Sequence, residues 1–155
     1  MIIALYGQPG SGKTTLSKEL QKSFFLNLDV FHKSMTPPIV DGDEIREIFK
    51  NKDYSKEGRI RNLQRISDIA TFLESKYNVV IISAIYPYLE ARNYLNSICE
   101  DVKWVHLFPT LDPKKIQYMV EDFEFPNEEK NTLVLDTQTY NIEGCTQMIM
   151  DFISQ

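Results

Sequence analysis

The segment Gly7-Gln8-Pro9-Gly10-Ser11-Gly12-Lys13-Thr14 is the feature that most narrows what this chain can fold into. It follows the apolar stretch 2–6 and precedes a segment of helical period, which is the context of a phosphate-binding loop. Glycines let successive backbone N–H groups point at phosphate oxygens, and the helix N-terminus adds partial positive charge there. The segment predicts a nucleoside triphosphate site for ATP, formed by Gly7, Gly10, Ser11, Gly12, Lys13, Thr14 and Thr15.

Two side chains of this loop would act directly on the nucleotide or its metal ion. The Lys13 ammonium would reach the β- and γ-phosphates and act in catalysis, and the Thr14 hydroxyl would ligate Mg²⁺. The alternative is a glycine-rich turn that merely joins a strand to a helix.

Length and charge limit the class of protein. A chain of 155 residues is expected to form a single domain, 1–155, with a core that needs no disulfides. The net charge of -5 would repel nucleic acid and favours a small-molecule substrate. We expect no membrane association and a cytoplasmic location, because the sequence lacks a long apolar stretch and a secretory leader. Cys99 and Cys145 are isolated, which predicts free thiols rather than a zinc site.

Short apolar runs alternate with segments of helical period along the chain. The expected strands cover 2–6, a short run ending at Ile39-Val40, 79–83, 103–108 and 133–135. The expected helices cover roughly 12–24, 43–51, 58–77, 89–98, 112–121 and 143–153. This order predicts a three-layer α/β fold like that of P-loop nucleoside triphosphate hydrolases, with a parallel five-stranded sheet and helices on both faces. Its active site is expected outside the carboxyl ends of the strands.

A carboxylate-rich segment, Asp41-Gly42-Asp43-Glu44-Ile45-Arg46, follows the second expected strand. A carboxylate here can accept the proton of an attacking hydroxyl or hold Mg²⁺ through water, and Arg46 can bind an anionic substrate. Asp43 is equally suited to cap the next helix. A catalytic and a structural role therefore both stay open for this segment.

Two polar residues continue the line of apolar side chains toward the N-terminal end of the helix expected at 58–77. Arg59 and Asn62 lie on the same side of that helix as Leu63, Ile66 and Ala70. Inward polar side chains at one helix end suggest that this end lines a cleft for a charged or nucleotide ligand. The alternative for Arg59 is a side chain that reaches past the core to solvent.

Together the motifs GQPGSGKTT, DGDEIR, YSKEGRIRNLQRI, IISAIYPYLEAR and LVLDT resemble those of the adenylylsulfate kinases, in the same order and over most of the chain. Members of that family transfer the γ-phosphate of Mg-ATP to the 3′-hydroxyl of adenosine 5′-phosphosulfate. The resemblance implies that Asp41 is the acid/base residue and that Asp43 supports the metal or the substrate. It also implies a substrate pocket formed by Arg46, Arg59 and Asn62 around the sulfate–phosphate anhydride, Tyr54 as the stacking surface for the base, and Ile82, Ser83 and Ala84. A homodimer is a further implication.

Two regions depart from the family pattern. Tyr86 stands where the family has a serine, and Leu89 stands where it has an arginine. The region 108–132 lacks the family's arginine and longer basic lid and carries an acidic, aromatic segment at 121–126. We expect its carboxylates, Glu121, Asp122 and Glu124, to bring negative charge where an anionic substrate must enter. A P-loop kinase for another small acceptor and a weakly active nucleotide-binding module therefore stay open as alternatives.

Overall fold

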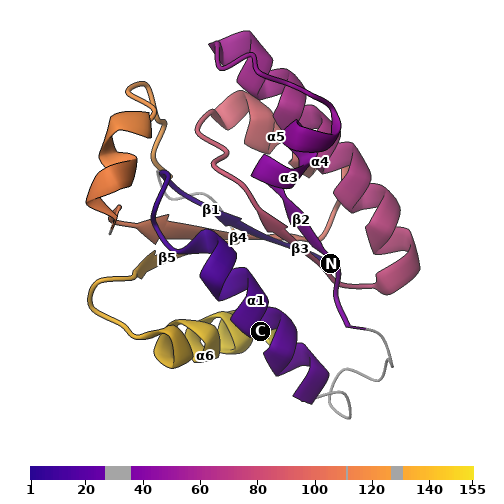
Figure 1. Cartoon of the computed structure of the whole chain (residues 1–155). Helices are drawn as coiled ribbons and strands as arrows, with labels where there is room; N and C mark the ends of the chain where they lie inside the picture. Colours follow the sequence, from indigo (N-terminus) through magenta and orange to yellow (C-terminus); the bar gives the residue numbers. More distant parts are fainter. Residues whose placement is uncertain (27–35, 111, 127–130) are drawn as a thin grey trace.

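Five parallel strands form one sheet in the computed structural model, which describes residues 1–26, 36–110, 112–126 and 131–155. The strands are β1 (Ile2–Tyr6), β2 (Ile39–Asp41), β3 (Val80–Ser83), β4 (Val102–Phe108) and β5 (Thr132–Asp136), in the spatial order β2-β3-β1-β4-β5. The order places β1 at the centre, so the glycine-rich segment begins in the middle of the carboxyl edge of the sheet (Figure 1). The predicted parallel sheet is confirmed.

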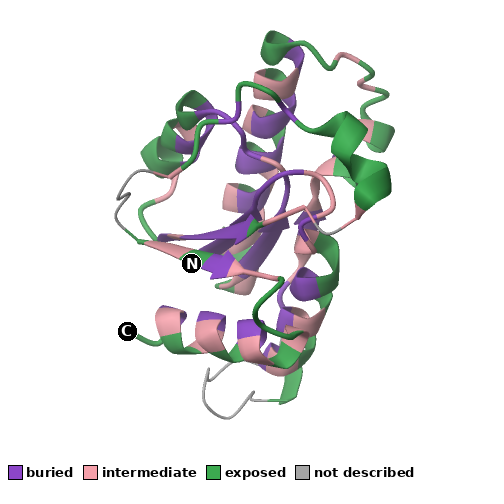
Figure 2. Cartoon of the chain, turned by 90° about the vertical axis from the view of Figure 1, so that its left-hand side faces the viewer, coloured by how far each residue is buried: buried purple, intermediate pink, exposed green. Residues whose placement is uncertain are grey.

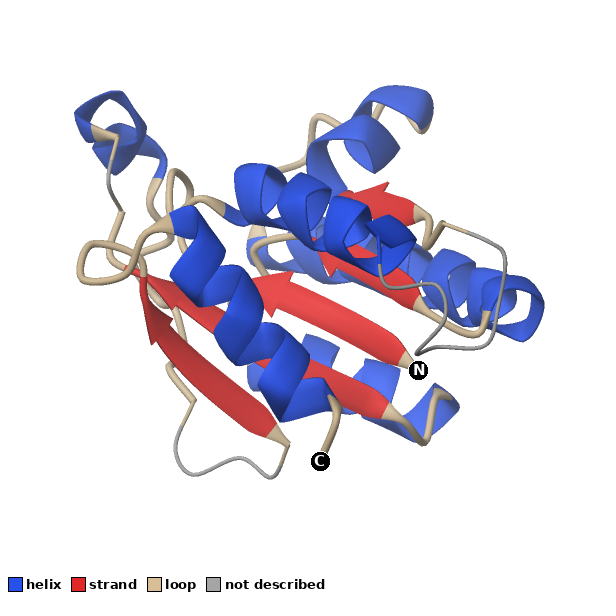
Figure 3. Cartoon of the chain, turned by 90° about the horizontal axis from the view of Figure 1, so that it is seen from below, coloured by secondary structure: helices blue, strands red, loops and turns tan. Residues whose placement is uncertain are grey.

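Helices cover both faces of this sheet. Helices α1 (Lys13–Leu26) and α6 (Ile142–Ile153) pack on one face, and α4 (Lys56–Tyr77) and α5 (Leu89–Ile98) pack on the other (Figures 1 and 3). The short α3 (Gly42–Ile48) follows β2 directly. None of the helices in the described parts of the chain is long and apolar enough to cross a membrane.

Each face of the sheet has its own apolar core, because successive strand residues point to opposite sides. Ile3 and Leu5 of β1 pack with the apolar residues of α1 and α6, whereas Ile2, Ala4 and Tyr6 pack with those of α4 and α5. The inner strands β1 and β3 are therefore buried on both faces, whereas the edge strands β2 and β5 are partly exposed (Figure 2). This double burial explains why β3 reads as an uninterrupted apolar run.

Two predicted helices differ from those observed. The helix expected at 112–121 is only a 3₁₀ helix, η1 (Pro113–Tyr118), and its residues are exposed. It has no apolar face to bury, and most helical stability in proteins comes from such burial. The helix expected at 43–51 ends at Ile48, and Lys50 adopts the left-handed conformation (φ 50°).

Candidate active site

The glycine-rich segment forms a tight loop between β1 and α1. Gly7, Gly10 and Gly12 have φ values of 147°, 79° and 93°, a region that L side chains rarely adopt. A Cβ on Gly7 would also lie 2.2 Å from the carbonyl oxygen of Leu107 in β4. Glycine at this position therefore lets the loop approach the neighbouring strand.

Lys13 folds back over this loop. Its Nζ donates hydrogen bonds to the carbonyl oxygens of Gly7 (3.0 Å) and Gln8 (2.7 Å) and lies 3.4 Å from Oγ of Ser11. Burial lowers the pKa of Lys13 to about 8, against the opposing effect of the Asp43 and Asp41 carboxylates. A phosphate in the loop would offer this ammonium stronger acceptors than two carbonyl groups.

Asp41 joins the loop to the helix that follows β2. One carboxylate oxygen accepts hydrogen bonds from the backbone N–H groups of Asp43 (3.0 Å) and Glu44 (3.5 Å), which makes Asp41 the N-cap of α3. The other oxygen accepts hydrogen bonds from the hydroxyl groups of Thr14 (3.2 Å) and Ser83 (3.1 Å). The cap is thus Asp41 rather than Asp43, and the second oxygen of the same carboxylate faces the phosphate loop.

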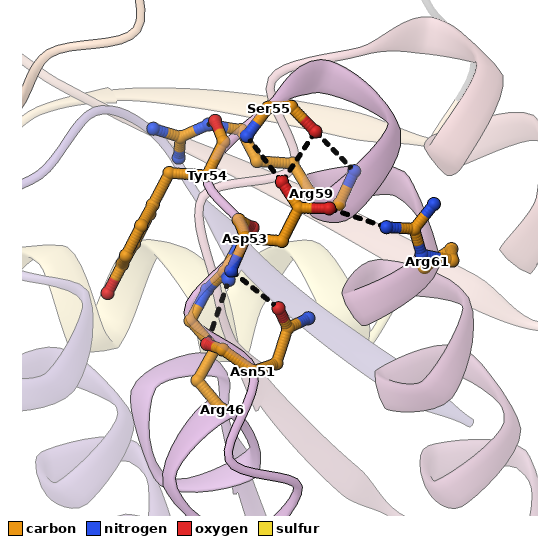
Figure 4. Close-up of polar contacts among 8 residues, drawn as sticks. Arg46, Asn51, Asp53, Tyr54, Ser55, Arg59 and Arg61 are labelled. Atoms are coloured by element: carbon orange, nitrogen blue, oxygen red, sulfur yellow. Dashed lines mark hydrogen bonds and ion pairs between the residues drawn. The ribbon is translucent and has the colours of Figure 1, made fainter.

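Arg46 and Arg59 meet at the ring of Tyr54 (Figure 4). The guanidinium carbon of Arg46 lies 4.5 Å from the ring centroid, and that of Arg59 lies 5.5 Å from it. Backbone carbonyl groups hold both arginines, since Arg46 donates to Asp53 (3.1 Å) and Arg59 donates to Tyr54 (3.0 Å). Two cations and an aromatic ring therefore lie together at the N-terminal end of α4.

The loop that carries Tyr54 is braced against the first turn of α4. The Asp53 carboxylate accepts from the backbone N–H and hydroxyl groups of Ser55 (3.0 and 2.6 Å) and pairs with Arg61 (2.5 Å). These hydrogen bonds lower the pKa of Asp53. A Cβ on Gly58 would lie 2.2 Å from Cγ of Asp53, so glycine is needed for this close approach.

Asn62, one turn further along α4, is 3% exposed. Its side-chain oxygen has no hydrogen-bond partner among the described residues. Arg59 is half-buried and lies, like Asn62, on the wall of a cavity. The structure therefore favours a cleft at this helix end over an arginine that only reaches past the core to solvent.

An open cavity of about 1310 Å³ joins the phosphate loop to the arginine cluster. Of the predicted site residues, those on its wall are Gly10, Gly12, Lys13, Thr14, Thr15, Asp41, Asp43, Arg46, Tyr54, Arg59, Asn62, Ser83 and Ala84. Gly7 and Ser11 are buried residues of the loop and do not line the cavity. Ile82 does not line it either and was wrongly assigned to the pocket, because its side chain is fully buried in the core under α4.

The carboxylates of the segment 121–126 do not line the cavity, contrary to expectation. The Asp122 carboxylate accepts from the hydroxyl of Tyr88 (3.2 Å), and the Glu124 carboxylate accepts from the backbone N–H of Leu89 at the start of α5. Phe123 is buried and stacks on Tyr6. These contacts turn the segment away from the cavity and hold it against α5, and Glu121 is exposed.

Sequence reasoning missed several cavity residues that follow β4. Lys115, Tyr118 and Met119 line the wall beside the phosphate loop. A Cβ on Gly10 would lie 3.0 Å from Cβ of Lys115, so η1 packs directly on the loop. The Asp112-Pro113-Lys114-Lys115 run was the available signal, but nothing local in it indicates packing on a loop that is far away in the sequence.

No cluster of His, Cys, Asp and Glu side chains in the described residues could hold a metal ion alone. The Thr14 hydroxyl and the Asp41 carboxylate, 3.2 Å apart at the phosphate loop, are oxygen ligands of the kind Mg²⁺ prefers. Since Mg²⁺ usually keeps several waters and binds through substrate phosphates, this donor set fits a metal that arrives with a nucleotide.

Comparison with known sequences shows a consistent likeness. The profile of the family described as adenylylsulphate kinase matches residues 1–119. The adenylyl-sulfate kinase of Staphylococcus carnosus is 25% identical over 99% of this chain and 83% of its own length. A probable adenylyl-sulfate kinase of Aeropyrum pernix is 29% identical over 92% of this chain and 86% of its own.

Solved structures agree on the fold. The Mycobacterium tuberculosis APS kinase CysC in complex with AMPPNP and APS superimposes with a TM-score of 0.82, covering 99% of this chain and 97% of that one. Its sequence is 20% identical, so this likeness concerns the fold alone. It confirms the predicted P-loop α/β architecture.

Proposed function

This chain belongs to the adenylylsulphate kinase family and is a phosphotransferase of that kind, and on this premise we propose that it transfers the γ-phosphate of Mg-ATP to the 3′-hydroxyl of adenosine 5′-phosphosulfate. The products would be ADP and 3′-phosphoadenosine 5′-phosphosulfate. The observation that carries the proposal is the position of Asp41. Its carboxylate accepts a hydrogen bond from Thr14 of the phosphate loop, and Asp41 lines the same cavity as Arg46 and Arg59.

The phosphate loop would bind the triphosphate. Its backbone N–H groups and the N-terminus of α1 favour anionic oxygens, and Lys13 would turn from the Gly7 and Gln8 carbonyl groups to the β- and γ-phosphates. Thr14 would hold Mg²⁺, and the carboxylates of Asp41 and Asp43, which line the same cavity, would contact its water ligands. Bound Mg²⁺ would neutralise charge on the transferring phosphoryl group.

Asp41 would orient and deprotonate the acceptor. As the 3′-oxygen attacks the γ-phosphorus, its proton passes to the Asp41 carboxylate, while the bond to the β,γ-bridging oxygen breaks and ADP leaves. The hydrogen bonds from Ser83 and from the start of α3 hold the carboxylate in one orientation. Preorganisation of this kind lets a general base act without reorientation during the reaction.

The acceptor would bind between α3 and α4. The cluster of Arg46, Arg59 and Asn62 offers cationic and amide donors for a sulfate–phosphate anhydride, and the Tyr54 ring offers an aromatic face for the base. In the free protein Arg46 covers part of that ring, so stacking of a base requires the guanidinium to move toward the anion.

A kinase for another small acceptor is the second candidate. The family profile ends at residue 119, and the segment that follows is docked on α5 instead of forming a basic lid. The acceptor specificity of this protein is therefore most free to differ from that of the family in the segment after residue 119.

The test is an acceptor panel with Mg-ATP. Adenosine 5′-phosphosulfate, AMP, other nucleoside monophosphates and sugars are each incubated with the enzyme, and ADP formation is followed. Adenosine 5′-phosphosulfate is expected to be the preferred acceptor. At about 100 times its Kd it should also raise Tm by about 5–10 °C. ADP formation with a different acceptor alone would favour the second candidate.

A further inference from the structure

Gln8 of the phosphate loop makes a pair of hydrogen bonds with a residue 112 positions away. Its side-chain amide donates to the carbonyl oxygen of Val120 (2.8 Å), and its side-chain oxygen accepts from the N–H of Val120 (2.9 Å). Both residues are buried, with 8% and 6% of their surface exposed. Gln8 does not line the cavity, so a direct contact with substrate does not explain it.

The chain on the amino side of Val120 forms the wall of the cavity next to the phosphate loop. Tyr118 and Met119 line the cavity immediately before Val120, and Lys115 packs on Gly10. Few other contacts hold this stretch, since η1 is exposed and contributes no buried residue. Its buried attachments among the described residues are therefore the pair of hydrogen bonds to Gln8, which are the polar ones, and the packing of the Val120 side chain in the apolar core under α4 and α5.

The chain on the carboxyl side of Val120 reaches the acceptor side of the cavity. The N–H of Glu124 donates to the carbonyl oxygen of Pro87 (2.8 Å), and Arg92 donates to the carbonyl oxygen of Glu124 (3.1 Å). Pro87 itself lines the cavity. The segment 118–124 thus spans from the phosphate loop to the acceptor side, and Gln8 holds its first end.

We propose that Gln8 is a positioning residue, which keeps the wall formed by Lys115, Tyr118 and Met119 in register with the phosphate loop. The wall then shields the γ-phosphate from water while the phosphoryl group is transferred, as closed active sites do. The transfer step in this inference rests on the proposed function. The attachment of the wall to the phosphate loop does not.

Only glutamine satisfies both groups of Val120 at this distance. Leucine has a similar size but offers no polar atom, and asparagine is one methylene shorter. Either change leaves the buried N–H and C=O of Val120 without partners, and a buried unpaired group costs more than a hydrogen bond normally contributes. The wall would then be held less firmly against the loop, because only the core packing of Val120 and the contact of Lys115 with Gly10 remain, while Lys13 and Thr14 are unchanged.

The experiment compares Gln8→Leu and Gln8→Asn with Gln147→Leu, which removes an exposed hydrogen bond to Asp151 on α6. Amide hydrogen exchange reports on Val120, and nucleotide titration gives the Kd for ATP. In both Gln8 variants the Val120 amide is expected to exchange at least about tenfold faster, with unchanged exchange in β1 and β4. The Kd and KM for ATP are expected to rise about tenfold, because the site is no longer preorganised. The control is expected to match the wild type.

A second readout is the ratio of free phosphate released to acceptor phosphorylated, which should rise in the Gln8 variants as water reaches the γ-phosphate. If the wild type phosphorylates no adenosine 5′-phosphosulfate, the proposed function fails, but exchange at Val120 and ATP affinity still decide the role of Gln8. Unchanged exchange at Val120 would overturn the inference. So would faster exchange with ATP affinity and phosphate release like those of the wild type.

Discussion

The hydroxyl of Thr14 donates a 3.2 Å hydrogen bond to the carboxylate of Asp41, which lies 27 positions later in the chain. The contact links the start of α1, which follows β1, to the end of β2, and β3 lies between these two strands in the sheet. A parallel sheet brings the ends of distant strands to one edge, and this edge gathers the groups that would bind metal, phosphate and acceptor. Asp41 lies at this edge and is proposed as the general base, a role that substitution of this residue tests directly.

Replacing Asp41 with asparagine separates its two roles. Asparagine caps helices about as well as aspartate, so Tm should change little. Loss of the general base should lower kcat about 10²-fold or more, with a small change in the Kd for ATP. Steady-state kinetics and thermal unfolding of the same variant check both expectations. An unchanged kcat together with unchanged stability would assign Asp41 to the helix cap alone.

Lys13 should make ATP binding depend on pH. Because burial lowers its pKa to about 8, the lysine of the free enzyme loses its charge above that pH and with it the attraction to phosphate. The Kd for ATP should rise by up to about tenfold per pH unit above pH 8. Burial disfavours the charged form of Lys13 and therefore lowers the free energy of unfolding of the free protein. This loss of stability is fully present below pH 8 and becomes smaller as the pH rises above 8.

Two variants control the pH experiment. Lys13→Arg keeps its charge throughout this range and should show a flat profile, whatever its absolute affinity. Lys13→Ala should stay folded and lose ATP turnover, because its side chain contacts the loop rather than the core. Near-native turnover by a folded Lys13→Ala variant would contradict the proposed phosphate site.

Arg59 and Arg61 lie two residues apart on α4 and provide a matched pair. Arg59 lines the cavity, whereas Arg61 pairs with Asp53 and does not. Arg59→Ala should raise the KM for adenosine 5′-phosphosulfate about tenfold or more, since charged hydrogen bonds are the stronger ones, and should leave the KM for ATP nearly unchanged. Arg61→Ala should change both values much less. Equal effects of the two substitutions would rule out a specific anion contact for Arg59.

Gly58 should be intolerant of a side chain. Gly58→Ala places a methyl group against the Asp53 carboxylate, and the strain should cost about 1–3 kcal/mol in the free energy of unfolding. Displacement of the 53–55 loop should also raise the KM for the acceptor. Gly144→Ala in the first turn of α6 is the control, because its nearest neighbour, the side-chain oxygen of the exposed Asn141, is 3.1 Å away and needs to shift by only a few tenths of an ångström. Equal unfolding free energies for the two variants would contradict this packing argument.

The sequence alone predicts the parts of the fold that depend on local patterns. The phosphate loop and its flanking elements were predicted almost to the residue, because glycine conformation, an apolar strand and a helix start act over short range. The helix expected at 112–121 was wrong for the opposite reason. Its extent depends on the packing of Lys115 on Gly10 and on the bonds from Gln8 to Val120, neither of which is visible in a local window.

The site residues that the sequence misassigned also depend on contacts between distant parts of the chain. Asp43 was the cap expected from the sequence, and the segment stayed open between a capping and a catalytic role. The structure makes Asp41 the cap with one oxygen, and only the folded chain brings Thr14 to the other. Ile82 was misplaced because helices cover both faces of β3, so its Ser83 neighbour at the strand end reaches the cavity and Ile82 does not. The carboxylates of Asp122 and Glu124 were misplaced because their donors are Tyr88 and Leu89, the N-cap and the first residue of α5.

The most direct measurement is mass spectrometry of the product formed from Mg-ATP and adenosine 5′-phosphosulfate, with Asp41→Asn as the comparison. The wild type is predicted to yield adenosine phosphosulfate carrying one additional phosphate on the 3′-oxygen, and the variant to yield about 10²-fold less in the same time. The phosphate position is verified by fragmentation. Binding of ATP without any such product, while another acceptor is phosphorylated, would contradict the proposed reaction.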